Sequence, residues 1–212
     1  MSTYLSIDID FWNWQVKSTA ERDLDRLFWL ASKLQIPTIA VMNHQQLTGY
    51  VTESKARKLV NIDTHSDLGD RWVSRYNCGS WVSYVPWRTE GEYKWIHRHS
   101  LKVGECNFPT SIFMPGTKAK KSLIEWKEAS HNQVEAMPSP SKLLRNCSNI
   151  GFVLSPSYCD DGLEDVFRYI VGKYKLQYAK GVRDEFNLGP HRVPYSKPEP
   201  QKYITTIEMI MI

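Results

Sequence analysis

The sequence feature that most constrains the fold is an apolar run that leads directly into Asp63-Thr64-His65-Ser66-Asp67. In an extended strand, alternate side chains point to the same face, so Asp63, His65 and Asp67 are expected to converge on one point. Carboxylates and imidazoles are common ligands of divalent metal ions. A solvated strand end would also tolerate these residues, but it leaves three like-facing ionisable groups at the mouth of an apolar strand unexplained. We therefore interpret this stretch as part of a metal site.

Two earlier segments repeat this design, in which an apolar strand ends at potential ligands. Residues 1–9 are predicted to form a strand with Asp8 and Asp10 at its end, two positions apart and on one side. Residues 36–42 are predicted to form a second strand, and His44 follows it. Taken alone, the aspartates could cap the next segment or face water, and the histidine could be a loop or core residue. If there were no metal site, these separate explanations would all have to apply at the same edge of the sheet. The combination of residues therefore favours a metal site.

Helical segments separate these strands. Ser18-Thr19-Ala20-Glu21 is a capping-box pattern that predicts a helix start, and a short helix is expected over 52–58 before a third strand at 59–62. This order predicts a three-layer α/β/α fold with a mainly parallel sheet, in which ligands bind at the carboxyl ends of the strands. Six candidate ligands fall at those ends: Asp8, Asp10, His44, Asp63, His65 and Asp67.

The second half of the chain has fewer functional signals. Apolar periodicity predicts helices over 122–129, 142–146 and 163–174 and a strand over 149–154. Residues 77–85 are expected to form a turn and a short helix. We predict a single domain over residues 1–212, in which 190–212 form a surface loop and a terminal strand.

Composition narrows the class of protein. The chain has 212 residues, of which 42% are hydrophobic and 24% charged, enough to bury the core of one domain. The net charge of +4 is scattered, so no nucleic-acid surface is indicated. The sequence has no apolar run near ~20 residues and no signal layout, which predicts a soluble, cytoplasmic protein without a membrane segment. Its four cysteines form no paired motif, so neither structural zinc nor a disulfide framework is expected.

The strand ends together resemble the arginase/deacetylase (ureohydrolase-like) superfamily of metal hydrolases. That superfamily is marked by an Asp-x-His-x-Asp strand end, an upstream histidine and an Asp-x-Asp strand end. The closer resemblance is to an uncharacterised arginase-like family, and it covers roughly residues 4 to 175. Four motifs carry it: Asp8-Ile9-Asp10-Phe11-Trp12, Asp63 to Leu68, Asn77 to Trp81 and Ser155 to Tyr158.

The resemblance implies two divalent metal ions, Mn²⁺ first, with Zn²⁺ or Fe²⁺ as alternatives. Two aspartates would bridge the ions, and each ion would have one further histidine and one further aspartate: Asp8 and Asp63 as bridges, His44 with Asp67, and His65 with Asp10. Such an ion pair lowers the pKa of a bridging water and delivers hydroxide to an electrophilic centre. In this superfamily the reaction is hydrolysis of a C–N bond in a guanidine, amidine or amide. The expected partner is therefore a small-molecule or amide substrate.

Further site residues are proposed beside these ligands. The candidates for acid or base catalysis are Asp67, His97 and His99. The candidates for substrate binding are Asn77, Ser80, Trp81, Ser155 and Asp160. The chain departs from arginases in order, because its Asp-x-Asp strand comes first. It also departs in sequence, because Asn13-Trp14 replaces an Asp-Pro pair and Gly79-Ser80-Trp81 replaces the segment with the proton-shuttling histidine.

Two other functions fit parts of the sequence. A strand that ends in Asp-x-Asp also resembles the haloacid-dehalogenase phosphatases, with Asp8 as nucleophile, Asp10 as acid/base and Asp160-Asp161 as a magnesium-binding pair. That reading leaves His44 and the Asp63–Asp67 motif without a role. The other alternative is a non-catalytic metal-binding or partner-binding protein on the same scaffold, which the replaced shuttle histidine favours. The oligomeric state stays open.

Overall fold

The computed structural model describes residues 2–67, 81–82, 85, 91–98 and 126–179. Its strands are β1 (Thr3–Asp8), β2 (Thr38–Val41), β3 (Lys58–Ile62), β4 (Gly91–His97), β5 (Trp126–Gln133), β6 (Cys147–Val153) and β7 (Gln177–Tyr178). Its helices are α1 (Lys17–Lys33), α2 (Leu47–Ser54), α3 (Pro140–Leu143) and α4 (Leu163–Tyr174), with two 3-10 helices, η1 (Ile9–Trp12) and η2 (His44–Gln46).

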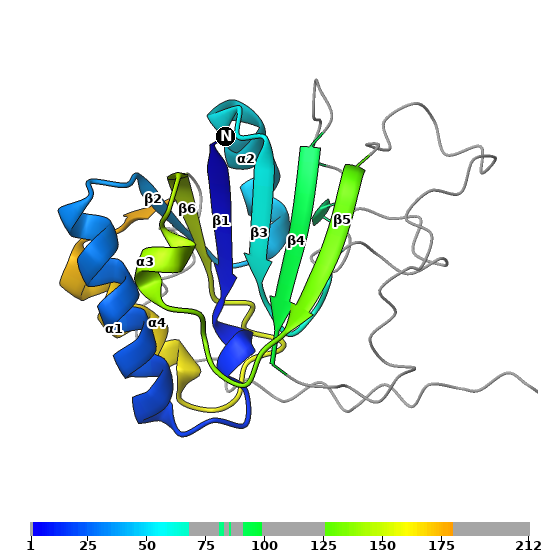
Figure 1. Ribbon diagram of the computed structural model, residues 1–212. Coiled ribbons are helices and arrows are strands. Elements are labelled where there is room, and N and C mark those ends of the chain that lie inside the picture. The colour runs from blue at the N-terminus through cyan, green and yellow to red at the C-terminus, as the bar shows by residue number, and fades with distance from the viewer. Residues whose placement is uncertain (1, 68–80, 83–84, 86–90, 99–125, 180–212) are drawn as a thin grey trace, which may run out of the picture.

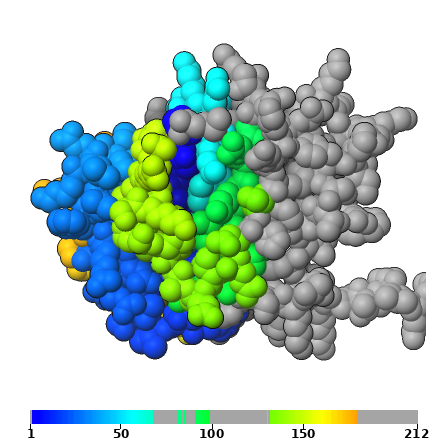
Figure 2. Space-filling model, in the orientation of Figure 1, coloured from blue at the N-terminus to red at the C-terminus, as the bar shows by residue number. Residues whose placement is uncertain are grey.

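One parallel sheet organises the described residues. Its strand order is β5-β4-β3-β1-β6-β2-β7, and the paired neighbours run parallel. Helices α1, α3 and α4 lie over one face and α2 over the other (Figure 1). In the space-filling view, α1 and the yellow-green segment that contains α3 close over the first of these faces (Figure 2). The predicted three-layer α/β/α fold with a parallel sheet is therefore confirmed.

The sheet is apolar on both faces because helices cover both. In β1, Leu5 and Ile7 pack on the side of α1 and α4, whereas Tyr4 and Ser6 lie on the side of α2. Side chains alternate along a strand, so Asp8 continues the α2 side. The strands are parallel, and the carboxyl ends of β3, β1, β6 and β2 therefore lie next to one another at one edge.

Helix α1 packs on the sheet through a helical stripe of buried residues: Ala20, Leu24, Leu27, Phe28 and Ala31. The helix begins at Lys17, and Val16 before it makes no side-chain cap. The prediction that Ser18 opens a capping box is therefore wrong. The first turn is instead held by the Thr19 N–H, which donates to the Val16 carbonyl at 2.7 Å, and by an ion pair between Lys17 and Asp165 at 2.9 Å.

The predicted helix over 122–129 is wrong where the structure describes it, because Trp126–Gln133 forms strand β5. This strand pairs with β4 along its whole length. Unpaired backbone groups at the edge of β4 offer a full ladder of hydrogen bonds, and such tertiary pairing overrides a weak helical propensity.

Other element boundaries differ by smaller amounts. Helix α2 covers 47–54, not 52–58, because Lys55 adopts a left-handed conformation (φ 54°) that ends it. Helix α3 begins at Pro140, not at residue 142, since proline suits the first helical position. The predicted helix over 163–174 is confirmed as α4. The predicted strands are confirmed as β1, β2, β3 and β6, with ends within two residues of those expected.

Some predictions fall outside the described residues. They include the loop and strand over 190–212 and most of the turn and helix over 77–85. Among the residues that the structure describes, helices are all too short or too polar to cross a lipid bilayer.

Candidate metal centre

The six candidate ligands come together at the carboxyl edge of the sheet. Asp8 ends β1, Asp10 lies in η1, and His44 opens η2 directly after β2. The other three lie in the turn that follows β3. All six side chains are buried except that of His65, which is 46% exposed.

One group of ligands, the inner half, surrounds the Nδ1 atom of His44. This nitrogen lies 3.2 Å from Asp8 Oδ2, 3.2 Å from Asp63 Oδ2 and 2.8 Å from Asp67 Oδ2. A ring nitrogen carries at most one proton, so it cannot donate to three carboxylates at once. Asp8, His44 and Asp63 each offer a ligand atom within 4.8 Å of the others. The inner half therefore has the spacing of a metal site.

The second group, the outer half, consists of Asp10, Asp63 and His65, whose ligand atoms also lie within 4.8 Å of one another. His65 Nδ1 is 3.1 Å from Asp10 Oδ2 and 3.6 Å from Asp63 Oδ1. Asp10 Oδ2 is buried, and among the described residues it makes no hydrogen bond of acceptable geometry. Buried oxygens almost always have a donor or a cation, so a metal ion fits this place.

Asp63 belongs to both halves through different oxygens. Its Oδ2 faces His44 and accepts from Asn61 Nδ2 at 3.1 Å. Its Oδ1 faces His65 and accepts the backbone N–H of that residue at 2.7 Å. The Asp63 carbonyl accepts from Trp95 Nε1 at 3.0 Å, which fixes the backbone as well. Asp63 is therefore the residue that joins the inner and outer halves.

The turn after β3 is bent, not extended, and this corrects one prediction. Asp67 has a left-handed backbone (φ 53°). Thr64 is tied to η1, because its N–H donates to Asp10 Oδ1 at 3.1 Å and its hydroxyl to the Asp10 carbonyl at 2.9 Å. The expectation that three alternate side chains meet at one point is wrong. The turn sends Asp67 to the inner half and His65 to the outer half.

Neutral groups orient the inner half. Ser6 Oγ lies 3.0 Å from His44 Nε2, and the Ser155 hydroxyl donates to Asp8 Oδ2. Such contacts fix the ring and carboxylate orientations of metal ligands. Sequence reasoning missed Ser6 and Asn61. A signal was available, because each is a polar residue two positions before a candidate ligand in an otherwise apolar strand, and so shares its face.

The electrostatics of the cluster are unfavourable without a cation. Burial and repulsion from Asp10 raise the pKa of Asp8 well above its usual range, and burial and Asp63 raise the pKa of Asp10 to about 6. Burial acts to lower the pKa of both histidines, but the surrounding carboxylates outweigh it. They raise the pKa of His44 to about 10 and that of His65 to about 12. The cluster therefore contains four carboxylates and only two imidazoles. Bound divalent cations would neutralise the excess negative charge.

The other predicted site residues have varied places. His97, one of the proposed catalytic residues, is buried at the end of β4 and stacks on Trp95, with ring centroids 4.0 Å apart.

The proposed substrate-binding residues differ in exposure. Ser155 is buried beside Asp8. Asp160 is exposed and accepts the Trp14 N–H at 2.5 Å. Trp81 is buried against Asp67 and His44 of the inner half. His99, Asn77 and Ser80 lie outside the described residues.

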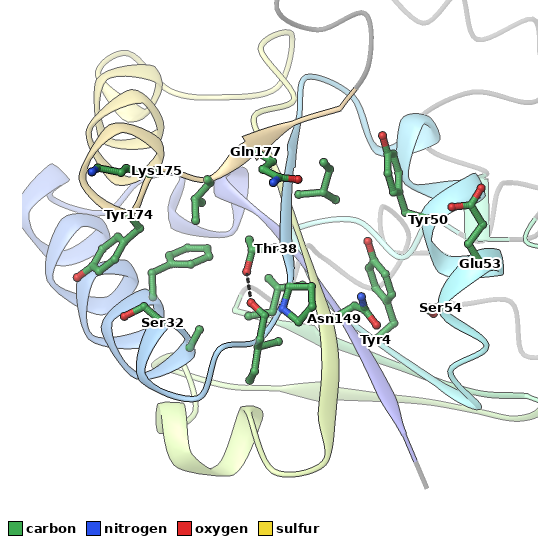
Figure 3. Close-up of a pocket in the computed structure, with 17 residues that line it drawn as sticks. Tyr4, Ser32, Thr38, Tyr50, Glu53, Ser54, Asn149, Tyr174, Lys175 and Gln177 are labelled. Atoms are coloured by element: carbon green, nitrogen blue, oxygen red, sulfur yellow. Dashed lines mark hydrogen bonds between the residues drawn. The ribbon is translucent and has the colours of Figure 1, made fainter.

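A cavity of about 500 Å³ lies at the opposite end of the strands. Its lining comes from the starts of β1, β2 and β6 and from α1 and α2, with Tyr4, Thr38, Tyr50 and Asn149 among the residues around it (Figure 3). None of the six candidate ligands lines it. This cavity is therefore separate from the metal centre.

Comparisons of the chain with family models, with curated proteins and with solved structures found no match. Inference about function therefore rests on the chemistry of the site.

Proposed function

We propose that this protein is a metal-dependent hydrolase that cleaves a C–N bond in a guanidine, amidine or amide. The observation that carries the proposal is the Asp63 carboxylate, whose two oxygens face two separate His–Asp groups. Mixed imidazole and carboxylate donors suit Mn²⁺, with Zn²⁺ or Fe²⁺ as alternatives. We take the substrate to be a small molecule or amide and the compartment to be the cytoplasm, as the sequence predicts.

Two bound ions would supply an acidified water and a Lewis acid for hydrolysis. The residues of the chain would hold and orient that chemistry. His44 and Asp8, both buried, would fix the inner ion, and Ser6 would set the imidazole orientation through Nε2. His65 is the half-exposed ligand, and the Tyr158 ring stands edge-on to it at 5.4 Å. Substrate would therefore approach from the His65 side.

The phosphatase alternative is less well supported by the contacts of its nucleophile. Asp8 Oδ1 accepts the Asp10 N–H at 3.0 Å, and its Oδ2 contacts both His44 and Ser155. Asp160, which that mechanism would use for magnesium, is exposed and bonded to the Trp14 backbone. The contacts of Asp8 tie it to His44, a residue to which the phosphatase mechanism gives no role.

Metal analysis combined with substrate panels tests the proposal. Purified wild type should carry close to two divalent ions and hydrolyse at least one guanidino, amidine or amide compound. We expect Asp63→Asn to lose both ions and the activity, and His65→Ala to lose one ion. Asp161→Asn should change neither.

Each alternative predicts a different outcome. A phosphatase would keep its activity in Asp63→Asn and lose it in Asp161→Asn. A binding protein would hold metal in stoichiometric amounts and turn over nothing. If wild type carried no bound metal and added Mn²⁺ did not raise its melting temperature, the metal centre itself would be overturned.

A further inference from the structure

Trp81 is a single side chain that touches two candidate ligands from different elements. Its indole Nε1 donates to Asp67 Oδ2 at 2.6 Å, and its ring stacks on the His44 imidazole, with centroids 5.2 Å apart and planes 19° apart. The side chain is fully buried. Val82, the next residue, donates its N–H to the Asp67 carbonyl at 3.2 Å, so the same segment also holds the backbone of that ligand.

Asp67 needs such support more than the other ligands of the inner half do. It lies in a turn, with a left-handed backbone that is uncommon for residues other than glycine. Asp67 Oδ2 and Asp63 Oδ2 both lie against His44 Nδ1, at 2.8 and 3.2 Å, so the two carboxylates are close and repel each other when both are ionised. Asp67 Oδ2 also lies 2.8 Å from His44 Nδ1, and it accepts from Asn61 Nδ2 over a long 3.4 Å.

An indole is well suited to this task. Its N–H only donates, and it neither titrates nor adds charge. It can therefore hold the Asp67 carboxylate in place with or without a bound ion. Its ring face meanwhile limits the rotation of His44, so one rigid group aligns an oxygen and a nitrogen on the same point.

We propose that Trp81 is a positioning residue that sets the affinity of the inner half for its metal ion by orienting Asp67 and His44. This differs from the substrate contact that the sequence suggests, because a fully buried indole aims its only polar atom at a ligand. The inference rests on the metal centre of the proposed function but not on the reaction.

The test uses the 212-residue chain after a chelator has removed bound ions. Isothermal titration calorimetry then measures its affinity for Mn²⁺. We expect Trp81→Phe to weaken the tighter of two Mn²⁺ sites about tenfold to a hundredfold, as loss of outer-shell contacts typically does. Trp12→Phe is the matched control. Trp12 is equally buried, and its Nε1 donates to the carboxylate of Asp23, which is not a candidate ligand. That variant should bind Mn²⁺ like wild type.

A double-mutant cycle separates positioning from packing. If Trp81 acts through Asp67, Trp81→Phe should weaken Mn²⁺ binding far less in an Asp67→Asn background than in wild type. Should Trp81→Phe fail to fold, benzothienylalanine at position 81 keeps the shape of the side chain and replaces only the N–H by sulfur. It should give the same loss of affinity.

Unchanged Mn²⁺ affinity in Trp81→Phe or in the sulfur analogue would overturn the inference. The inference would also be overturned if the losses of Mn²⁺ binding free energy caused by Trp81→Phe and Asp67→Asn were additive in the double variant. Wild type that binds no divalent ion would overturn it together with the metal centre. Wild type that binds Mn²⁺ but hydrolyses nothing would sink the proposed reaction and leave the role of Trp81 standing.

Discussion

At the scale of single residues, the cluster is defined by an excess of negative charge in a buried place. Asp8, Asp10, Asp63 and Asp67 are buried together, and two imidazoles lie among them. Buried carboxylates are costly unless they are paired, protonated or bound to metal. His44 Nδ1 faces three of these carboxylates and can donate only one proton. Protonation of His44 therefore compensates their negative charge less well than a bound divalent cation would.

The metal-free protein should lose stability as the pH rises. In the folded state the pKa of Asp10 rises from 3.8 to about 6, and that of His44 from 6.5 to about 10. Each group then binds its proton more tightly when folded. Its stabilising contribution is complete below the unfolded pKa and is lost as the pH rises through the folded pKa. The free energy of unfolding in EDTA should therefore fall between about pH 4 and pH 10.

Urea denaturation in EDTA at about pH 5, 7 and 9 measures this trend. Saturating Mn²⁺ should reverse it, because metal binding requires deprotonated ligands and strengthens as the pH rises. The account of the cluster fails if the EDTA-treated protein gains stability over that range.

At the scale of elements, the sequence predicted four of the seven described strands, β1, β2, β3 and β6, and the helix α4. It did not predict β4 or β7, and it predicted a helix where β5 lies. Those four strands are apolar runs with buried faces, and α4 has a clear helical stripe, so the apolar pattern was enough to find them. The split of His65 from Asp67 depends on a left-handed turn residue that is not glycine, which no pattern announces. Strand β5 depends on pairing with β4, which is non-local.

Leu47 of α2 packs closely on Gly151 of β6, next to the turn that carries a candidate ligand. A Cβ at Gly151 would lie 2.6 Å from Leu47 Cδ1, and Leu47 directly follows the η2 turn that carries His44. We expect Gly151→Ala to destabilise the fold by about 1–3 kcal/mol through overpacking. It should also weaken Mn²⁺ binding, because Leu47 is fully buried and its displacement is expected to move the adjoining η2 turn.

The matched control is Gly49→Ala in α2 itself. A Cβ there meets nothing within 4 Å, so alanine should stabilise the helix by roughly 0.4–1 kcal/mol. Chemical denaturation and Mn²⁺ titration of both variants measure the two effects. Equal stability of Gly151→Ala and wild type would show that Leu47 moves aside without cost.

At the scale of the whole molecule, the common edge of the site was predictable because parallel strands all end on one side. Which strands are neighbours was not. The order β3-β1-β6-β2 brings Ser155, which follows β6, to Asp8 at the end of β1, although 147 positions separate them in sequence. The sequence alone offered Ser155 only as a substrate contact. Its bond to a candidate ligand is a consequence of strand order.

Metal should stabilise the whole domain, because the ligands come from three separate strand ends that unfolding pulls apart. An ion at ~100 times its dissociation constant adds about 3 kcal/mol by mass action. For a domain of this size that corresponds to a rise in Tm of roughly 5–10 °C. Differential scanning fluorimetry with and without Mn²⁺ measures it, and Asp63→Asn should show no rise. An equal rise in that variant would place the stabilising ion elsewhere.

The uneven exposure of the two histidines gives the cluster a direction. An ion that arrives from solvent would meet the half-exposed His65 first and then the buried Asp10. It would reach the buried His44 by passing from one Asp63 oxygen to the other. The inner position would therefore empty last and exchange slowest. A reagent that acylates imidazoles should modify His65 and not His44. Modification of His65 should then prevent both ions from reaching their positions.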